Sequence, residues 1–160
     1  MRVFDASSMI YAWDNYPIRQ FPGLWEWIAD ELAEKTLTMP QIAFDEVKQK
    51  APECAQWLKA NAIDLLKVTE EIVQEALRIK KLVGIAGDKY HPKGVGENDL
   101  FIIATAKVHT SILVTDEERQ TTLPLEPTKR KIPVVCGMNE VHVPCINFIE
   151  FLKDSEKVFR

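Results

Sequence analysis

Residues 98–106 have the sequence Asn-Asp-Leu-Phe-Ile-Ile-Ala-Thr-Ala, an apolar run with a single carboxylate, Asp99, near its start. We expect a buried helix here, because a carboxylate in the first turn interacts favourably with the helix dipole. The helix leads into residues 111–115, Ser-Ile-Leu-Val-Thr, which have the composition of a strand. Three acids follow that strand directly, at positions 116–118. The central pattern of the chain is therefore a helix with an acid at its start, followed by a strand with acids at its end.

Lone acids also stand beside other apolar segments. Asp5 follows the short apolar run of residues 2–4 at the beginning of the chain, and Glu46 lies within residues 43–47, Ala-Phe-Asp-Glu-Val. A short apolar run bounded by a carboxylate and two serines is typical of a buried strand that precedes a helix. Carboxylates at the ends of such elements can converge on one spot.

Short apolar runs alternate with helical patterns along the whole sequence. The expected strands cover residues 2–4, 37–39, 65–68, 111–115 and 134–136. The expected helices cover residues 9–13 (capped by Ser7 or Ser8), segments beginning at Pro22 and Pro40, and residues 52–60, 70–82, 98–106 and 144–155. This alternation predicts an α/β fold, a three-layer α/β/α arrangement around a mostly parallel sheet. In such sheets, ligands bind outside the carboxyl ends of the strands, where Asp5 and residues 116–118 are expected.

Residues 84–96 interrupt this alternation with four glycines and one proline. Long loops in compact domains are often functional, and we interpret this one as a flexible flap near the acidic edge. Its glycines lack the Gly-Lys-Ser/Thr ending of a phosphate-binding loop.

The length of 160 residues predicts one soluble domain covering residues 1–160. The net charge of −4 is spread over mixed-sign segments, so any contact with nucleic acid is expected to be local. Three cysteines at unequal spacing argue for reduced thiols and a cytoplasmic protein. The longest apolar stretch, residues 100–114, is interrupted by Lys107 and His109 and is too short to span a bilayer, so we expect no membrane partner. The first residues form only a short apolar run that ends at Asp5, so we expect no signal peptide.

Carboxylates that are packed together at the end of a buried sheet repel one another and are costly to desolvate. A divalent cation removes that cost, and a ligand set made only of carboxylate oxygens suits Mg²⁺ or Mn²⁺. Such ions orient and deprotonate a water for in-line attack on a phosphodiester and stabilise the departing oxygen. The residue types therefore favour metal-dependent phosphodiester hydrolysis.

The order of these acids resembles the PIN domain family of metal-dependent nucleases. Residues 3–7, Val-Phe-Asp-Ala-Ser, match its opening strand, Asp and small hydroxyl residue, and Glu46 matches a Glu on the helix after a short Pro-containing segment. Asp99 matches the Asp that opens an Ala-rich apolar helix, and residues 114–117, Val-Thr-Asp-Glu, match the closing strand and its acid. The resemblance covers residues 2–118 and implies the fold and the activity of that family.

The resemblance also implies roles for individual residues. Asp5, Glu46 and Asp99 would hold the Mg²⁺ or Mn²⁺ ion, and Asp116 or Glu117 would bind it through water or tune the site. The family's last motif places an Asp two residues after the Thr, where this chain has Glu117, so the fourth ligand stays open between the two. Ser7 and Thr115 would support the ligands, and no His or Cys nucleophile is needed because a water molecule attacks.

Many small stand-alone PIN proteins are toxin ribonucleases of toxin–antitoxin pairs. The resemblance therefore implies an RNA substrate, a small antitoxin protein as partner and, since relatives often dimerise, a homodimer. Lys89, Lys93 and Lys107 are the cations nearest to Asp99 in the sequence and are the candidates for contacting substrate phosphates.

Three other functions compete with this interpretation. Cys136, His142 and Cys145 could form a zinc site, but a fourth ligand is missing and their spacing matches no standard zinc-knuckle motif. An aspartyl phosphatase also begins with an apolar strand and Asp5, but its chemistry needs a second Asp where Ser7 stands. The stronger rival is a catalytically silent PIN-like module that binds nucleic acid or protein.

Overall fold

The computed structural model describes all 160 residues and is built on a five-stranded sheet in the order β3-β2-β1-β4-β5, in which all neighbouring strands are parallel. The strands are β1 (Arg2–Phe4), β2 (Leu37–Pro40), β3 (Asp64–Leu66), β4 (Ile112–Val114) and β5 (Cys145–Ile146). β1 is central, and its last residue Phe4 lies opposite Val114, the last residue of β4. The residues that follow these two strands, Asp5 and Thr115, are therefore neighbours at the carboxyl edge of the sheet.

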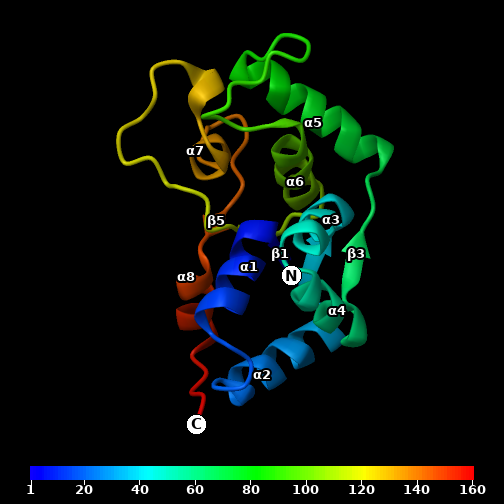
Figure 1. Cartoon of the computed structure of the whole chain (residues 1–160). Coiled ribbons are helices and arrows are strands. Elements are labelled where there is room, and N and C mark those ends of the chain that lie inside the picture. The colour runs from blue at the N-terminus through cyan, green and yellow to red at the C-terminus, as the bar shows by residue number, and fades with distance from the viewer.

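Helices surround this sheet, as Figure 1 shows. They are α1 (Ala6–Asn15), α2 (Pro22–Ala33), α3 (Gln41–Lys50), α4 (Pro52–Ala60), α5 (Glu70–Val83), α6 (Glu97–Val108), α7 (Ile132–Cys136) and α8 (Phe148–Ser155), with a 3₁₀ turn η1 (Pro127–Lys129). Helices α2 and α3 contact β2, and α6 contacts β4. The predicted α/β fold with a parallel sheet covered by helices is confirmed.

Local signals position several of these helices. Thr69 caps α5 by accepting a hydrogen bond from the Ile72 amide, and Gly84 ends the helix with a φ of +83°, which glycine adopts without steric cost. Pro22 and Pro52 each begin a helix, where a missing N–H costs nothing. These signals explain why the predicted helices at residues 52–60 and 70–82 agree with α4 and α5.

Three details of the prediction are wrong. The cap of α1 is Asp5, whose side chain accepts a hydrogen bond from the Ser7 amide, and neither serine caps the helix. Residues 134–136 belong to helix α7, because the buried residues Ile132, Val135 and Cys136 have the i, i+3, i+4 spacing of one helical face. The last strand is instead the two-residue β5, and the terminal helix begins at Phe148, not at Pro144.

The buried apolar side chains form one continuous cluster. Phe4 of β1 packs edge-on against Phe151 of α8 at a ring-centroid distance of 5.0 Å. Trp25 of α2 lies between Trp13 and Trp57 at 5.4 and 4.9 Å, so these tryptophans pack in or against the core as expected. No helix of the chain combines the length and the apolar character needed to cross a membrane.

Two long loops lie against each other beside the carboxyl edge. The first joins α5 to α6, and the second joins β4 to α7 and is the extended yellow segment in Figure 1. The Val95 amide donates a 2.9 Å hydrogen bond to the Arg130 carbonyl, and a Cβ at Gly94 would lie only 1.8 Å from the carbonyl oxygen of Thr128. The glycine at position 94 therefore permits the close approach of the two loops.

Candidate active site

Asp5 lies at the centre of the carboxyl edge and is held by neighbouring hydroxyls. Its Oδ2 accepts hydrogen bonds from Thr115 Oγ1 at 2.6 Å and from Ser7 Oγ at 2.8 Å, and its Oδ1 accepts one from the Ser7 amide at 3.3 Å. The Asp5 amide donates to the Val114 carbonyl at 3.0 Å, which continues the pairing of β1 with β4. Only 3% of Asp5 is exposed, so its carboxylate is fixed in position.

Burial raises the pKa of Asp5 even though the hydrogen bonds from Thr115 and Ser7 lower it, and the negative charge of Glu46 raises it further. The hydroxyl donors therefore stabilise the charged form of Asp5 only in part. A nearby cation would stabilise this charged form further.

Asp99 lies in the first turn of α6, where its Oδ2 accepts a 2.8 Å hydrogen bond from the Gly96 amide. Burial raises the pKa of Asp99 to about 6, against the lowering effect of that hydrogen bond. The charges of Asp5, Glu117 and Glu46 each raise it as well. The charges of the three other acids therefore act on Asp99.

Glu46 reaches the site from the middle of α3 and not from the end of a strand. Its Oε1 lies 3.0 Å from Lys50 Nζ, one helical turn further along α3, and the Lys50 side chain is largely exposed and that of Glu46 partly exposed. The hydrogen bond and charge of Glu46 raise the pKa of Lys50, with smaller contributions from Glu117 and Asp5. Lys50 is therefore the cation most closely associated with these acids.

The two candidates for the fourth acid point in different directions. Burial raises the pKa of Glu117, as do the charges of Asp5 and Glu46, while Lys131 lowers it from 3.9 Å away. Asp116 Oδ2 instead accepts hydrogen bonds from Ser8 Oγ at 2.7 Å and from the amide of Phe148, the first residue of α8, at 3.2 Å. The charge of Glu117 thus interacts with those of the other three acids, whereas Asp116 connects α1 to the start of α8.

The hydroxyls of Ser7 and Thr115 also orient the chain that carries these two acids. The Asp116 amide donates to Ser7 Oγ at 2.9 Å, and the Glu117 amide donates to Thr115 Oγ1 at 3.2 Å. Each hydroxyl therefore joins Asp5 to the segment after β4.

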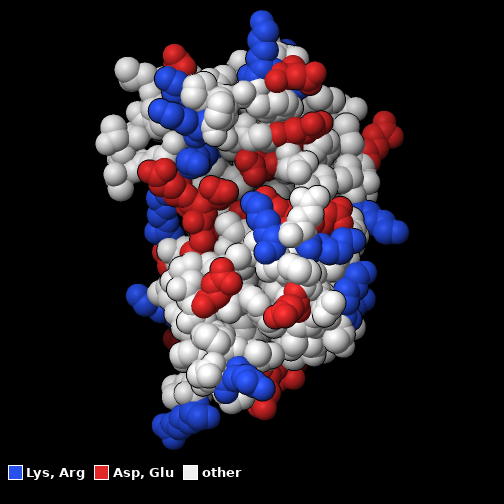
Figure 2. Space-filling model, in the orientation of Figure 1, with Lys and Arg blue, Asp and Glu red and all other residues white.

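Figure 2 shows acidic side chains gathered across the middle of one face of the molecule, with Lys and Arg side chains on both sides of them. In Figure 1 this region lies between α1 on one side and α6 and α7 on the other, with α3 beside it. Asp5, Glu46, Asp99 and Glu117 come from four separate segments of the chain, and each of them acts electrostatically on at least one other.

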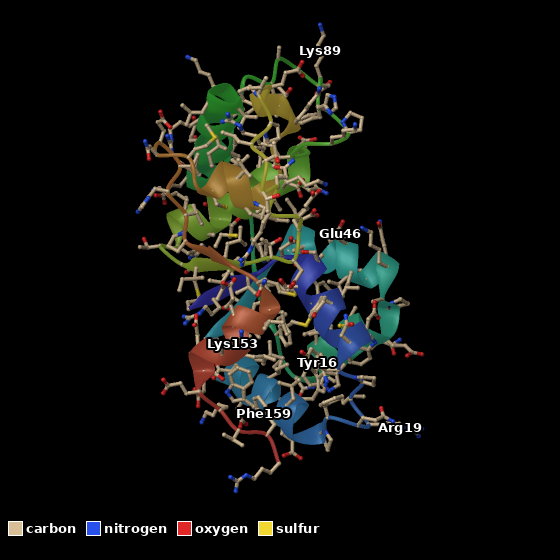
Figure 3. The ribbon with its side chains drawn as sticks, turned by 90° about the vertical axis from the view of Figure 1, so that its left-hand side faces the viewer. Tyr16, Arg19, Glu46, Lys89, Lys153 and Phe159 are labelled. Carbon is tan, nitrogen blue, oxygen red and sulfur yellow. The ribbon has the colours of Figure 1, made fainter.

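The lysines predicted to contact substrate are placed less favourably. Lys107 is at the far end of α6 from Asp99, about 12 Å along the helix, and lines a different cavity together with His142. Figure 3 shows Lys89 at the outer tip of its loop, well apart from Glu46. Lys93 is exposed on the same loop, where its amide donates to His91 Nδ1.

Lys50 and Lys131 form ion pairs with two acids of the candidate site, and neither was predicted from the sequence. The signal for Lys50 is its position four residues after Glu46 on one helix, a spacing that brings opposite charges together. Lys131 belongs to the basic run of residues 129–131, and nothing local in the sequence connects that run with Glu117.

The four acids offer only carboxylate oxygens, the ligand type that Mg²⁺ and Mn²⁺ prefer. The raised pKa values of Asp5, Asp99 and Glu117 indicate negative charge that a cation would stabilise. As the side chains stand, no three His, Cys, Asp or Glu residues lie close enough together to hold an ion. Glu46 is partly exposed, so its side chain is free to turn from Lys50 toward the other acids. The donor set therefore fits such an ion by its chemistry. The three cysteines are free thiols, and they are not part of any group of three or more side chains that could hold a zinc ion.

The parallel sheet and its order of helices define a PIN-like α/β domain, the class that the sequence resembles. The chain belongs to the family described as a domain of unknown function, DUF4411, whose model matches residues 3–159. No curated protein matches the chain in sequence.

Several solved structures share the fold of this chain. They include VapBC2 from Rickettsia felis bound to a DNA fragment from its promoter (TM-score 0.51, 16% identity, covering 91% of this chain and 97% of that one). FitAB bound to an IR36 DNA fragment is also similar (TM-score 0.53, 17% identity, 92% and 94% covered). VapBC-1 from nontypeable Haemophilus influenzae is a third example (TM-score 0.50, 17% identity, 92% and 98% covered). At these identities, the likeness establishes the fold.

Proposed function

We propose that this chain is a metal-dependent nuclease, an endoribonuclease that hydrolyses RNA phosphodiester bonds as a single PIN-like domain. The observation that supports the proposal is the electrostatic interaction of Asp5, Glu46, Asp99 and Glu117, with Asp5 at the carboxyl edge of a parallel sheet. This edge is where parallel α/β folds bind their ligands. The repulsion between these carboxylates, which Lys50 and Lys131 offset only in part, favours the binding of a divalent cation.

The residues divide this work between them. Asp5 is a rigid ligand because Ser7 and Thr115 hold its carboxylate, and Asp99 is fixed by its bond to the Gly96 amide. Glu46 and Glu117 are more exposed and adjust their positions around the ion. When bound, Mg²⁺ or Mn²⁺ would orient and activate a water for in-line attack and stabilise the leaving oxygen.

The ligands must be ionised to hold the cation, so metal affinity depends on pH. Because the pKa of Asp99 is about 6, this group is largely protonated at pH 5 and largely ionised at pH 7.5. We therefore expect Mn²⁺ binding and cleavage to weaken steeply as the pH falls below about 6.

A cleavage assay tests the activity. Single-stranded RNA and single-stranded DNA are incubated with Mn²⁺ and wild-type protein, Asp5→Asn or Asp99→Asn. Asp45→Asn is the matched control, since Asp45 lies next to Glu46 in the sequence but pairs with Gln41 at the exposed surface. The proposal expects RNA cleavage by the wild type and the control only. Equal activity in all four proteins would indicate contamination, and RNA binding without cleavage by the wild type would favour the silent module.

We further propose that the protein acts in the cytoplasm as the toxin of a toxin–antitoxin pair and is silenced by a small partner protein. The resemblance to PIN toxins and the likeness to the VapBC and FitAB structures support this role. Induced expression of the wild type should arrest bacterial growth, whereas Asp5→Asn at equal abundance should not. Unimpaired growth with active wild-type enzyme would contradict the toxin role and leave the nuclease proposal intact.

A further inference from the structure

Two lysines act as counter-ions of the acidic site. Lys50 Nζ lies 3.0 Å from Glu46 Oε1, and Lys131 Nζ lies 3.9 Å from Glu117 Oε2. Both partners are acids that the proposed function assigns to the cation. The lysines and a divalent ion therefore compete for the same oxygens.

The two lysines belong to different elements of the fold. Lys50 is the last residue of α3, and 63% of its side chain is exposed. Lys131 immediately precedes α7, and its backbone is fixed because its amide donates a 2.7 Å hydrogen bond to Gln120 Oε1. Gln120 Nε2 also donates to the Lys129 carbonyl at 2.9 Å, so one glutamine side chain closes the base of the loop that carries Lys131.

A divalent cation on Glu46 and Glu117 would remove the partner of each lysine and would also repel its ammonium group. Each side chain is long and at least partly exposed, so it can turn outward without breaking the core. The negatively charged group that arrives at this position with a nucleic-acid substrate is a backbone phosphate.

We propose that Lys50 and Lys131 are substrate-binding residues that exchange Glu46 and Glu117 for backbone phosphates of single-stranded RNA. This inference rests on the proposed function and adds the residues that hold the substrate there. It replaces Lys89, Lys93 and Lys107 in that role.

If Lys50 exchanges partners in this way, removing its charge should strengthen Mn²⁺ binding and weaken RNA binding. A lysine with a merely structural role would not produce these opposite changes. Lys50→Met removes the competitor, so the Kd for Mn²⁺ alone should fall about two- to fivefold, the range of an exposed ion pair. The same variant should bind RNA more weakly, with KM raised about three- to tenfold, kcat nearly unchanged, and the salt dependence of log KM reduced by about 0.7 for the lost phosphate contact.

Lys48→Met is the matched control. Lys48 is on the same helix and the variant has the same change of charge, but Lys48 lies 6.0 Å over the ring of Phe44, on the side of α3 away from Glu46. It should change neither affinity by more than a small nonspecific amount. Lys50→Arg should restore most of the RNA binding, and Lys131→Met should repeat the effect of Lys50→Met.

Calorimetric titration with Mn²⁺ alone measures the first affinity and does not depend on cleavage. Steady-state cleavage of an RNA oligonucleotide measures the second, and fluorescence anisotropy of the same oligonucleotide replaces it if the wild type does not cleave. Opposite shifts in an inactive protein would support the lysine exchange and overturn the nuclease proposal. Unchanged or parallel shifts in an active enzyme would overturn the exchange alone.

Discussion

Thr115 Oγ1 donates a 2.6 Å hydrogen bond to Oδ2 of Asp5, although the two residues are 110 positions apart in the sequence. The contact exists because β1 and β4 are parallel neighbours that end at the same level. The same hydroxyl accepts a hydrogen bond from the Glu117 amide, so one side chain orients two of the four acids. A substitution at position 115 therefore tests whether this orientation matters for the cation.

Thr115→Val keeps the shape of the side chain and removes its hydroxyl. The pKa of Asp5, which that hydroxyl lowers, should rise further, and less of the charged form will be available to a metal ion at pH 7. We expect Mn²⁺ affinity to fall about tenfold, as when a supporting hydrogen bond of a metal ligand is lost. Calorimetric titration with Mn²⁺ measures the change.

Thr105→Val is the control for this experiment. Thr105 is equally buried, but its hydroxyl donates to the Phe101 carbonyl within α6 and touches none of the acids. A similar loss of Mn²⁺ affinity in both variants would show that the effect comes from general destabilisation.

The sequence predicted most of the fold because its signals are local. Pro22, Pro52, Thr69 and Gly84 mark helix ends by their own backbone and side-chain chemistry. The C-terminal part was predicted less well, since the helical spacing in residues 132–136 covers little more than one turn and a two-residue strand has no period at all. Strand β5 is defined by its pairing with β4, in which the Leu113 amide donates to the carbonyl of Pro144, just before β5, and the Thr115 amide donates to the carbonyl of Ile146. Such nonlocal bonds leave little trace in the sequence.

The acids were predicted by their order along the chain, but their partners were not. The choice between Asp116 and Glu117 depends on the Ser8 hydroxyl and on the amide of Phe148, a residue 32 positions away. The pairing of Lys131 with Glu117 depends on the loop that Gln120 closes. Only the folded chain contains these relationships, whereas the helical spacing of Glu46 and Lys50 was present in the sequence.

Asp116 and Glu117 should respond differently to the loss of charge. Asp116→Asn weakens the bonds to Ser8 and to the start of α8, which an acid also stabilises through the helix dipole. We expect it to lower the free energy of unfolding by about 1–2 kcal/mol in urea titrations and to retain cleavage activity.

Glu117→Gln should do the reverse. It removes a repelling charge, so stability should be unchanged or higher, and the cleavage rate should fall about 10–100-fold. Full activity in Glu117→Gln together with inactive but folded Asp116→Asn would assign the fourth acid to Asp116.

Gly94→Ala should separate the two loops beside the site. The new Cβ would meet the Thr128 carbonyl oxygen at 1.8 Å, so backbone must shift, at a cost of about 1–3 kcal/mol in urea unfolding. Gly137→Ala is the matched control, because its Cβ finds only ordinary contacts, 3.5 Å or more from the nearest atom. Equal stability of the two variants would show that the loops are not held together.

Asp99→Asn should stabilise the metal-free protein in a pH-dependent way. The folded pKa of Asp99 is about 6, above its ordinary value of 3.8, so the folded state binds more protons between these values and stability falls as the pH rises from about 4 to 6. Asn removes that loss and still offers an oxygen to the Gly96 amide. In EDTA, Tm should therefore rise by about 2–4 °C at pH 7.5 and change little at pH 4. Added Mn²⁺ should reverse the ranking at pH 7.5, because only the wild type gains from the full set of ligands. A variant that is less stable at pH 7.5 in EDTA would mean that the charge of Asp99 is not repelled in the fold.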